Sequence, residues 1–371
     1  MITLESVTKS FPDGTVAVRE LSLEVPEGEV AVLVGPSGCG KTTTLRMINR
    51  MIEPSGGRIV VNGRDIMSVE PPQLRRGIGY VIQQIGLFPH RTVAQNIGTV
   101  PKLVGWDDQR IHERSGELMD LVGLPQEAAT RYPHQLSGGQ QQRVGVARAL
   151  AVDPPIMLMD EPFGAVDPIV RERLQDEFLR LQQEVKKTIV FVTHDIDEAL
   201  KMGNRVAILR EGGELAQYAT PEDLLAAPAD EFVAGFLGAE RGLKRLALIP
   251  VSEVKAEAGP AVSPNDDPSR AKEAARDAGT DWVVVVDEGR LLGWVYVSDL
   301  DGGRDVSAAD PRPFSARISA DDSLRAALNA MVTSRTGVAV RVSGEDTYEG
   351  ILTQELITGE LLHPDRQPDG S

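Results

Sequence analysis

The chain has 371 residues and a formal net charge of −16, with 41% hydrophobic and 25% charged residues. This length exceeds one typical domain, and the composition is that of a soluble globular protein. The acidic balance and the absence of a large basic block argue against a nucleic-acid partner. A single cysteine, Cys39, excludes an intrachain disulfide and suits a reducing compartment. No apolar run approaches the ~20 residues that cross a bilayer, and the first residues do not resemble a signal peptide.

A glycine-rich segment follows the apolar run Val30–Val34, which we predict to be a strand. The segment reads G-x-x-x-x-G-K-T over Gly35–Thr42, and the next ten residues, 43–52, are predicted to be a helix. Strand, loop and helix in this order predict a phosphate-binding P-loop, because the backbone N–H groups and the helix N-terminus attract anions. Lys41 is then expected to reach the β- and γ-phosphates of ATP, and Thr42 to ligate Mg2+. The residues predicted to bind ATP are Gly35, Pro36, Ser37, Gly38, Cys39, Gly40, Lys41, Thr42 and Thr43.

Three later apolar runs end in polar residues, namely Gln83, the pair Asp160 and Glu161, and His194. The carboxyl ends of strands in an open α/β sheet meet at the edge where ligands bind. We therefore expect Asp160 to hold Mg2+, Glu161 to polarise the attacking water, and Gln83 to reach the metal or the water. His194 is expected to contact the γ-phosphate. A solvated amide and a structural histidine are the plainer interpretations of Gln83 and His194.

Of three other segments, two are open to two interpretations. Phe11, in the β-rich start, is either a core residue or an aromatic that stacks on adenine. Residues 91–135 read as helices inserted between strands of the sheet. Leu136–Arg143 precedes a predicted helix over 144–151, and Ser137 with the two following glycines suits either a helix N-cap alone or a phosphate cradle.

These motifs, in this order and spacing, resemble the ATP-binding subunits of ABC transporters over residues 1–240. The resemblance implies an α/β fold, namely a P-loop NTPase domain of the ABC type with a helical insertion at about 91–150. It implies that Phe11 stacks on adenine, that Glu161 is the general base, that His194 is the switch histidine and that Gln83 belongs to the Q-loop. ATP and Mg2+ are the implied cofactors.

The same resemblance implies a head-to-tail homodimer, in which each signature loop closes on ATP held by the other copy. The residues expected to act in trans are Ser137, Gly138, Gly139, Gln140 and Asp167. The surface around 83–89 is expected to meet an integral-membrane permease, through which an extracytoplasmic substrate-binding protein is reached. The chain would then be peripheral, at the cytoplasmic face of the inner membrane.

The run Val81–His90 and the architecture of the tail resemble the quaternary-amine importers, which take up glycine betaine, carnitine or choline. An importer of another small solute, such as an amino acid, is one alternative. A nucleotide-gated regulatory ATPase that is not coupled to transport is another. A soluble repair or translation ATPase is disfavoured, because those proteins usually carry two ATPase domains or a long coiled-coil insertion.

The tail contains a repeated pattern of acidic N-cap, helix, strand, turn and strand, over 266–300 and again over 321–357. It resembles a tandem pair of CBS (cystathionine-beta-synthase) domains, which implies an α+β module that senses nucleotides or ionic conditions. We expect a linker and first repeat over 241–308, and a second repeat with a short tail over 309–371. Asp299 and Thr353 are the candidate regulatory residues, although each repeat keeps only half of the family's ligand pattern. A packing module that helps dimerisation is the alternative.

Overall fold

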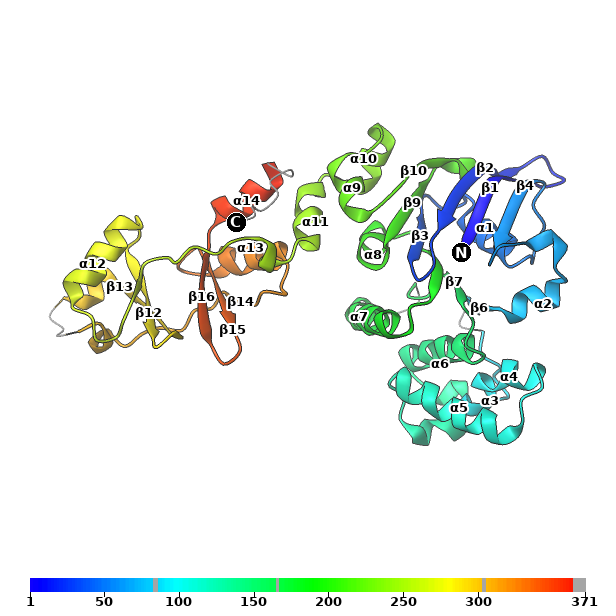
Figure 1. The fold of residues 1–371 in the computed structure, drawn as a ribbon, viewed down its shortest axis with the longest axis horizontal. Helices are drawn as coiled ribbons and strands as arrows, with labels where there is room; N and C mark the ends of the chain where they lie inside the picture. Colours follow the sequence, from blue (N-terminus) through cyan, green and yellow to red (C-terminus); the bar gives the residue numbers. More distant parts are fainter. Residues whose placement is uncertain (83–85, 165–166, 302–304, 363–371) are drawn as a thin grey trace. The chain divides into compact units, whose positions relative to one another are not determined.

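The computed structural model describes residues 1–82, 86–164, 167–301 and 305–362. The chain divides into two compact units, Met1–Leu237 and Gly238–Ser371. The order of the elements along the chain can be followed by colour in Figure 1.

A largely parallel sheet forms the centre of the first unit, with strands in the order β10-β9-β3-β8-β7-β6. Only β10 runs antiparallel to its neighbour in this sheet. Every residue of β3, β7 and β8 is buried, as expected for strands covered on both faces. The carboxyl ends of β3, β6, β7 and β8 therefore lie at one edge. The strands are β3 (Val30–Val34), β6 (Ile78–Val81), β7 (Ile156–Asp160), β8 (Thr188–Val192), β9 (Arg205–Leu209) and β10 (Leu215–Ala219).

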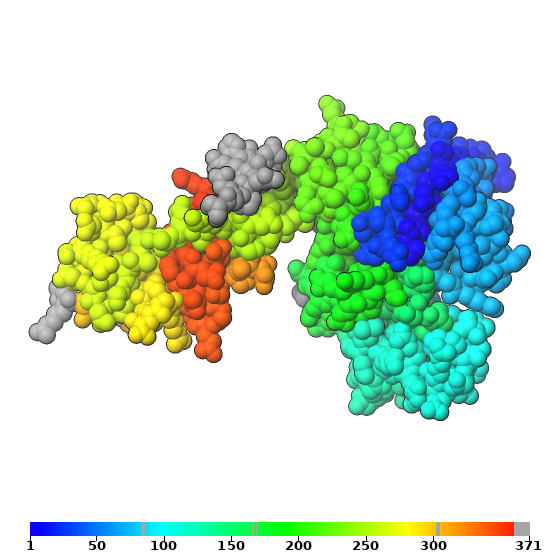
Figure 2. Space-filling view, viewed as in Figure 1, coloured from blue at the N-terminus to red at the C-terminus, as the bar shows by residue number. Residues whose placement is uncertain are grey.

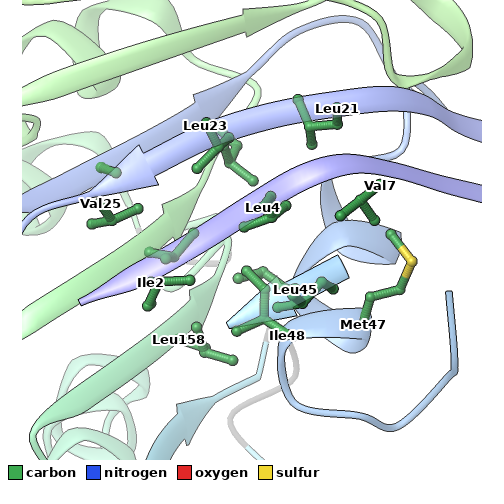
Figure 3. Close-up of a cluster of buried hydrophobic side chains, with 14 of the residues drawn as sticks. Ile2, Leu4, Val7, Leu21, Leu23, Val25, Leu45, Met47, Ile48 and Leu158 are labelled. Carbon is green, nitrogen blue, oxygen red and sulfur yellow. The ribbon is translucent and has the colours of Figure 1, made fainter. Parts of the chain in front are cut away.

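An antiparallel sheet, in the order β2-β1-β4-β5, covers the helix that follows the P-loop. Its strands are β1 (Ile2–Ser10), β2 (Val16–Val25), β4 (Gly56–Val61) and β5 (Arg64–Asp65), and the helix is α1 (Lys41–Ile48). Ile2, Leu4, Leu45, Ile48 and Leu158 belong to one buried aliphatic cluster, which joins this sheet, α1 and the central sheet (Figure 3). The packing fixes α1, and with it the loop at its N-terminus.

The segment between β6 and β7 is helical, and in the space-filling view its cyan part projects from the rest of the unit (Figure 2). Its helices are α3 (Val93–Ile97), α4 (Thr99–Leu103), α5 (Asp108–Leu121) and α6 (Gly138–Leu150). The remaining helices of the unit are α2 (Pro71–Arg76), α7 (Pro168–Val185), α8 (Ile196–Met202), α9 (Pro221–Ala226) and α10 (Glu231–Leu237).

The second unit contains one sheet in the order β11-β12-β13-β16-β15-β14. In each half a short strand pairs in parallel with the first strand of an antiparallel hairpin, so the two halves repeat the same topology. The first half comprises β11 (Ala261–Val262), α12 (Pro268–Asp277), β12 (Trp282–Asp287) and β13 (Arg290–Tyr296). The second comprises β14 (Arg317–Ile318), α13 (Leu324–Thr333), β15 (Ala339–Ser343), β16 (Thr347–Leu352) and α14 (Gln354–Leu362), and α11 (Arg241–Leu248) precedes both.

Two predicted helix boundaries were wrong. The helix predicted over 43–52 begins at Lys41, because the left-handed φ of +96° at Gly40 ends the loop there, and it stops at Ile48. The helix predicted over 144–151 begins at Gly138, because Ser137 and Gln140 form a capping box that offsets the poor helix propensity of the two glycines.

Candidate functional site

The P-loop lies so close to two neighbouring strands that side chains are excluded at two of its glycines. A Cβ on Gly35 would lie 2.4 Å from the carbonyl oxygen of Leu209 in β9. A Cβ on Gly40 would lie 2.2 Å from the carbonyl oxygen of Ala17 in β2. Glycine at these positions therefore lets the loop turn tightly between the two sheets and start α1 at Lys41.

The Lys41 ammonium is directed back over the loop that precedes it. Its Nζ donates to the carbonyl oxygens of Gly35 and Pro36, at 2.7 and 2.9 Å. Lys41 is 7% exposed, so the positive charge is held among the backbone dipoles of the loop. Burial raises the pKa of the nearby Cys39 thiol, and the cysteine acts as a small buried residue of the turn.

Thr42 and Asp160 meet at the carboxyl edge of the central sheet. The Thr42 hydroxyl donates to Oδ1 of Asp160 at 3.0 Å. Burial raises the pKa of Asp160, whereas the hydrogen bond from Thr42 opposes that rise. A hydroxyl beside a carboxylate is an oxygen donor set of the kind that Mg2+ prefers, with the substrate phosphates completing the coordination.

Glu161 and His194 form a second pair beside the first. Nδ1 of His194 lies 3.2 Å from Oε1 of Glu161. Glu161 takes a left-handed φ of +44°, and its amide donates to the carbonyl oxygen of Val192 at 2.9 Å. This backbone bond ties the residue after β7 to the end of β8, so the carboxylate and the imidazole are held at the same edge.

Sequence reasoning missed two groups next to Asp160. Arg46 of α1 lowers the pKa of Asp160 through its charge, although less strongly than burial raises it. Burial raises the pKa of Tyr80 on β6, and the charge of Asp160 adds to that rise. A signal for Arg46 existed in its spacing, since it follows Thr42 by one helical turn and so shares its face of α1.

The signature residues lie at the N-terminus of α6. The Ser137 hydroxyl accepts from the amide of Gln140 at 3.3 Å, and Oε1 of Gln140 accepts from the amide of Ser137 at 3.0 Å. Ser137 and Gly138 are exposed. Gln142 connects α6 to the carboxyl edge of the central sheet, because its side-chain amide nitrogen donates to the carbonyl oxygen of Pro162, the residue after Glu161.

Three further predicted site residues are Phe11, Asp167 and Gln83. Phe11 is 37% exposed, with the Lys9 ammonium 5.3 Å from its ring centroid, so the interpretation of Phe11 as a core residue is excluded. Asp167 is exposed and immediately precedes α7. Gln83 lies outside the described residues.

Both candidate regulatory residues of the second unit have partners within that unit. Asp299 pairs with Arg312 at 2.9 Å. The Thr353 hydroxyl accepts from the amide of Leu356 at 3.4 Å, at the start of α14. Each side chain therefore has a structural role in this arrangement.

Comparison with known proteins decides the family. The profile described as "ABC transporter" matches residues 18–164. The osmoprotectant import ATP-binding protein OsmV of Salmonella typhimurium is 46% identical over 369 residues, which cover 97% of this chain and 96% of that protein. This chain belongs to the ATP-binding subunits of ABC transporters. The choline transport ATP-binding protein OpuBA of Bacillus subtilis is 50% identical over 304 residues, covering 81% of this chain and 80% of that protein.

The structural comparison agrees with this family. The dimeric structure of a bacterial ABC transporter cassette aligns with a TM-score of 0.55 and 35% identity, covering 60% of this chain and 99% of that chain. The predicted P-loop ATPase fold of the ABC type is confirmed, and the chain is an ABC-type ATPase that binds ATP. Within the described residues, no helix of this ABC subunit is both long and apolar enough to cross a bilayer. The assignment of the second unit as a CBS pair stays a prediction.

Proposed function

We propose that this chain is the ATP-hydrolysing subunit of an importer for quaternary-amine osmoprotectants. The observation that carries the proposal is the meeting of two pairs, Thr42 with Asp160 and Glu161 with His194, at one sheet edge beside the P-loop. The relatives support the solute class, since their names refer to osmoprotectant import and to choline transport.

In the proposed reaction Lys41 exchanges its bonds to the loop carbonyls for bonds to the β- and γ-phosphates of ATP. Thr42 and Asp160 would hold Mg2+, which neutralises phosphate charge when it is bound. Glu161 takes the proton of the attacking water as general base. His194 orients the Glu161 carboxylate through Nδ1.

The signature residues are proposed to act across a homodimer. Ser137 and Gly138 are exposed at the N-terminus of α6, where partly positive backbone N–H groups attract anions. Gly139, Gln140 and the exposed Asp167 complete the face that would meet ATP on a second copy. The dimeric ABC transporter cassette among the structural relatives supports this arrangement.

The permease is proposed to dock on the surface formed by α3, α4 and the chain segment before them. Phe88, in the segment before α3, is 38% exposed, and Leu103, at the end of α4, is 71% exposed. A membrane subunit that covers them would place the chain at the cytoplasmic face of the membrane, and an extracytoplasmic binding protein would deliver the solute to that subunit.

The catalytic assignment is tested with Glu161→Gln and Lys41→Ala. Glu161→Gln is expected to bind ATP, to accumulate as an ATP-bound dimer and to lose turnover by about a hundredfold or more, because the base is gone. Lys41→Ala is expected to lose ATP affinity. The measurements are ATPase rate, ATP binding and sedimentation with ATP. Turnover by Glu161→Gln at the unsubstituted rate would contradict the assignment of the base.

The solute is tested by uptake in cells that lack this chain and regain it on a plasmid. We expect radiolabelled glycine betaine, carnitine or choline to accumulate at high osmolarity only with the active chain and not with Glu161→Gln. Uptake of an amino acid instead of these amines would refute the solute assignment while leaving the ATPase assignment intact.

A further inference from the structure

A buried polar contact that the proposed reaction does not use joins α7 to α8. Nε2 of Gln175 donates to Oε1 of Glu198 at 2.9 Å, and both residues are 7% exposed. Burial raises the pKa of Glu198, and hydrogen bonds from Thr193 and Gln175 oppose the rise. Replacing buried charged contacts by apolar residues of similar volume is often neutral or stabilising. Stability alone therefore does not account for this contact.

Glu198 is placed to control the loop that carries His194. Its carboxylate lies close enough to the side chain of Thr193, the residue before His194, for Thr193 to lower its pKa. Its own amide donates to Oδ1 of Asp195, the residue after His194, at 3.3 Å. One residue thus interacts with the chain on both sides of the histidine.

Gln175 connects this arrangement to the start of α7. The helix begins directly after Asp167, whose carbonyl oxygen accepts from the amide of Arg171 at 2.8 Å. Gln175 follows Arg171 by four residues and so lies one turn further along the same face. Any displacement of Asp167 that α7 transmits would therefore reach Gln175.

We infer that Glu198 and Gln175 are positioning residues for ATP hydrolysis, which together link the Asp167 loop to the contact between His194 and Glu161. The inference rests on the proposed function, in which Asp167 meets a second copy of the chain. When that contact forms, the buried amide–carboxylate bond fixes α8 against α7, and Nδ1 of His194 stays within reach of the general base.

A second contact between α7 and α8 provides a matched control. Nζ of Lys201 lies 2.7 Å from Oδ1 of Asp176, and these side chains are 33% and 51% exposed. An exposed ion pair is screened by water and contributes little. Lys201→Met therefore removes a contact between α7 and α8 without touching the buried one.

The experiment uses the full chain and measures kcat and KM for ATP in four variants. Gln175→Leu removes the donor and is expected to lower kcat by about tenfold, because misplacement of a catalytic group costs rate rather than substrate affinity. Gln175→Glu sets two buried carboxylates against each other and is expected to lower kcat further. Adding Glu198→Gln to Gln175→Glu exchanges the amide and the carboxylate, and should restore kcat to within about threefold. Lys201→Met should stay within about twofold.

The KM for ATP should change by less than about twofold in every variant, because the P-loop is untouched. A purely structural contact would lower the melting temperature without lowering kcat in variants that remain folded, and that result would overturn the inference. Failure of the exchanged pair to recover kcat while Gln175→Leu keeps full activity would also overturn it. Absence of turnover in the unsubstituted chain would contradict the proposed function itself, which is a separate outcome.

Discussion

The Thr42 hydroxyl donates a hydrogen bond to Asp160, a carboxylate whose ionised form is disfavoured by burial. Burial raises the pKa of Asp160, and the hydroxyl of Thr42, with the charges of Arg46 and Lys41, works in the opposite direction. Because the Thr42 hydroxyl and the Asp160 carboxylate are the proposed metal ligands, their bond keeps a ligand pair in place before the metal arrives.

Thr42→Val tests that pair, because valine keeps the shape of threonine and removes the hydroxyl. We expect the Mg2+ concentration for half-maximal ATPase activity to rise by about tenfold or more, as is typical when a metal site loses a ligand or its support. Thr99→Val, in α4, is the control and should leave the Mg2+ titration unchanged. An unchanged titration for Thr42→Val would remove Thr42 from the metal site.

Tyr218 gives a pH-dependent contribution to stability. Its hydroxyl donates to the carbonyl oxygen of Glu24 at 2.7 Å, and burial raises the pKa of Tyr218 to about 12. An unfolded tyrosine ionises near about pH 10, so the contribution is present below about pH 10 and is lost as pH rises toward about 12. Tyr218→Phe should therefore melt at a lower temperature than the unsubstituted chain at about pH 8, and the difference should shrink by about pH 11. A constant difference over this range would contradict the prediction.

At the scale of elements, α6 shows where local sequence signals were sufficient and where they were not. The P-loop was predictable because its glycines, lysine and flanking strand are contiguous in the chain. The N-cap at Ser137 was also predictable and is confirmed, but the helix was expected only from residue 144, because Gly138 and Gly139 have poor helix propensity and the capping box of Ser137 and Gln140 outweighs it. The bond between Gln175 and Glu198 joins residues on two separate helices and has no motif of its own. Gln83 stays a prediction.

Ser137 allows the cap to be separated from the proposed phosphate contact. Ser137→Ala removes the capping oxygen and should destabilise the chain by about 1 kcal/mol. Ser137→Asp keeps a good N-cap but places a carboxylate where the phosphates of the second copy are proposed to lie, so it should keep stability and lose hydrolysis. Melting temperature and ATPase rate are measured for both variants. Normal hydrolysis by Ser137→Asp would contradict the action of Ser137 in trans.

At the scale of the whole molecule, the second unit is a duplication in which the segment before each half pairs with a strand of the other half. Glu257, in the segment before the first half, pairs with Ile351 of β16, and Arg312, before the second half, pairs with Trp294 of β13. A buried cluster that includes Val284, Val340 and both of those strand residues spans the halves. The repeat was visible in the sequence, but the exchange of leading segments was not, because pairing partners so distant in the chain leave no periodic signal.

The exchange of leading segments predicts a single unfolding transition for residues 238–371. Val283→Ala lies in the buried cluster of the first half, and Leu352→Ala in that of the second. Each should lower the same melting transition, because neither half completes its sheet without the other, and each loss of core volume costs about 1–5 kcal/mol. Hydrogen exchange should show both halves losing protection together. Two separate transitions would contradict this linkage.

The exchange of leading segments also bears on how copies of this chain would associate when part of the fold opens. A half that loses its own leading segment leaves strand edges with unpaired N–H and C=O groups, which template pairing with another chain. The equivalent segment of a neighbouring molecule carries the same residues and fits the same edge, so a swapped dimer would form without any new contact. Partial unfolding of the second unit at high concentration would thus yield interlocked oligomers rather than disordered precipitate.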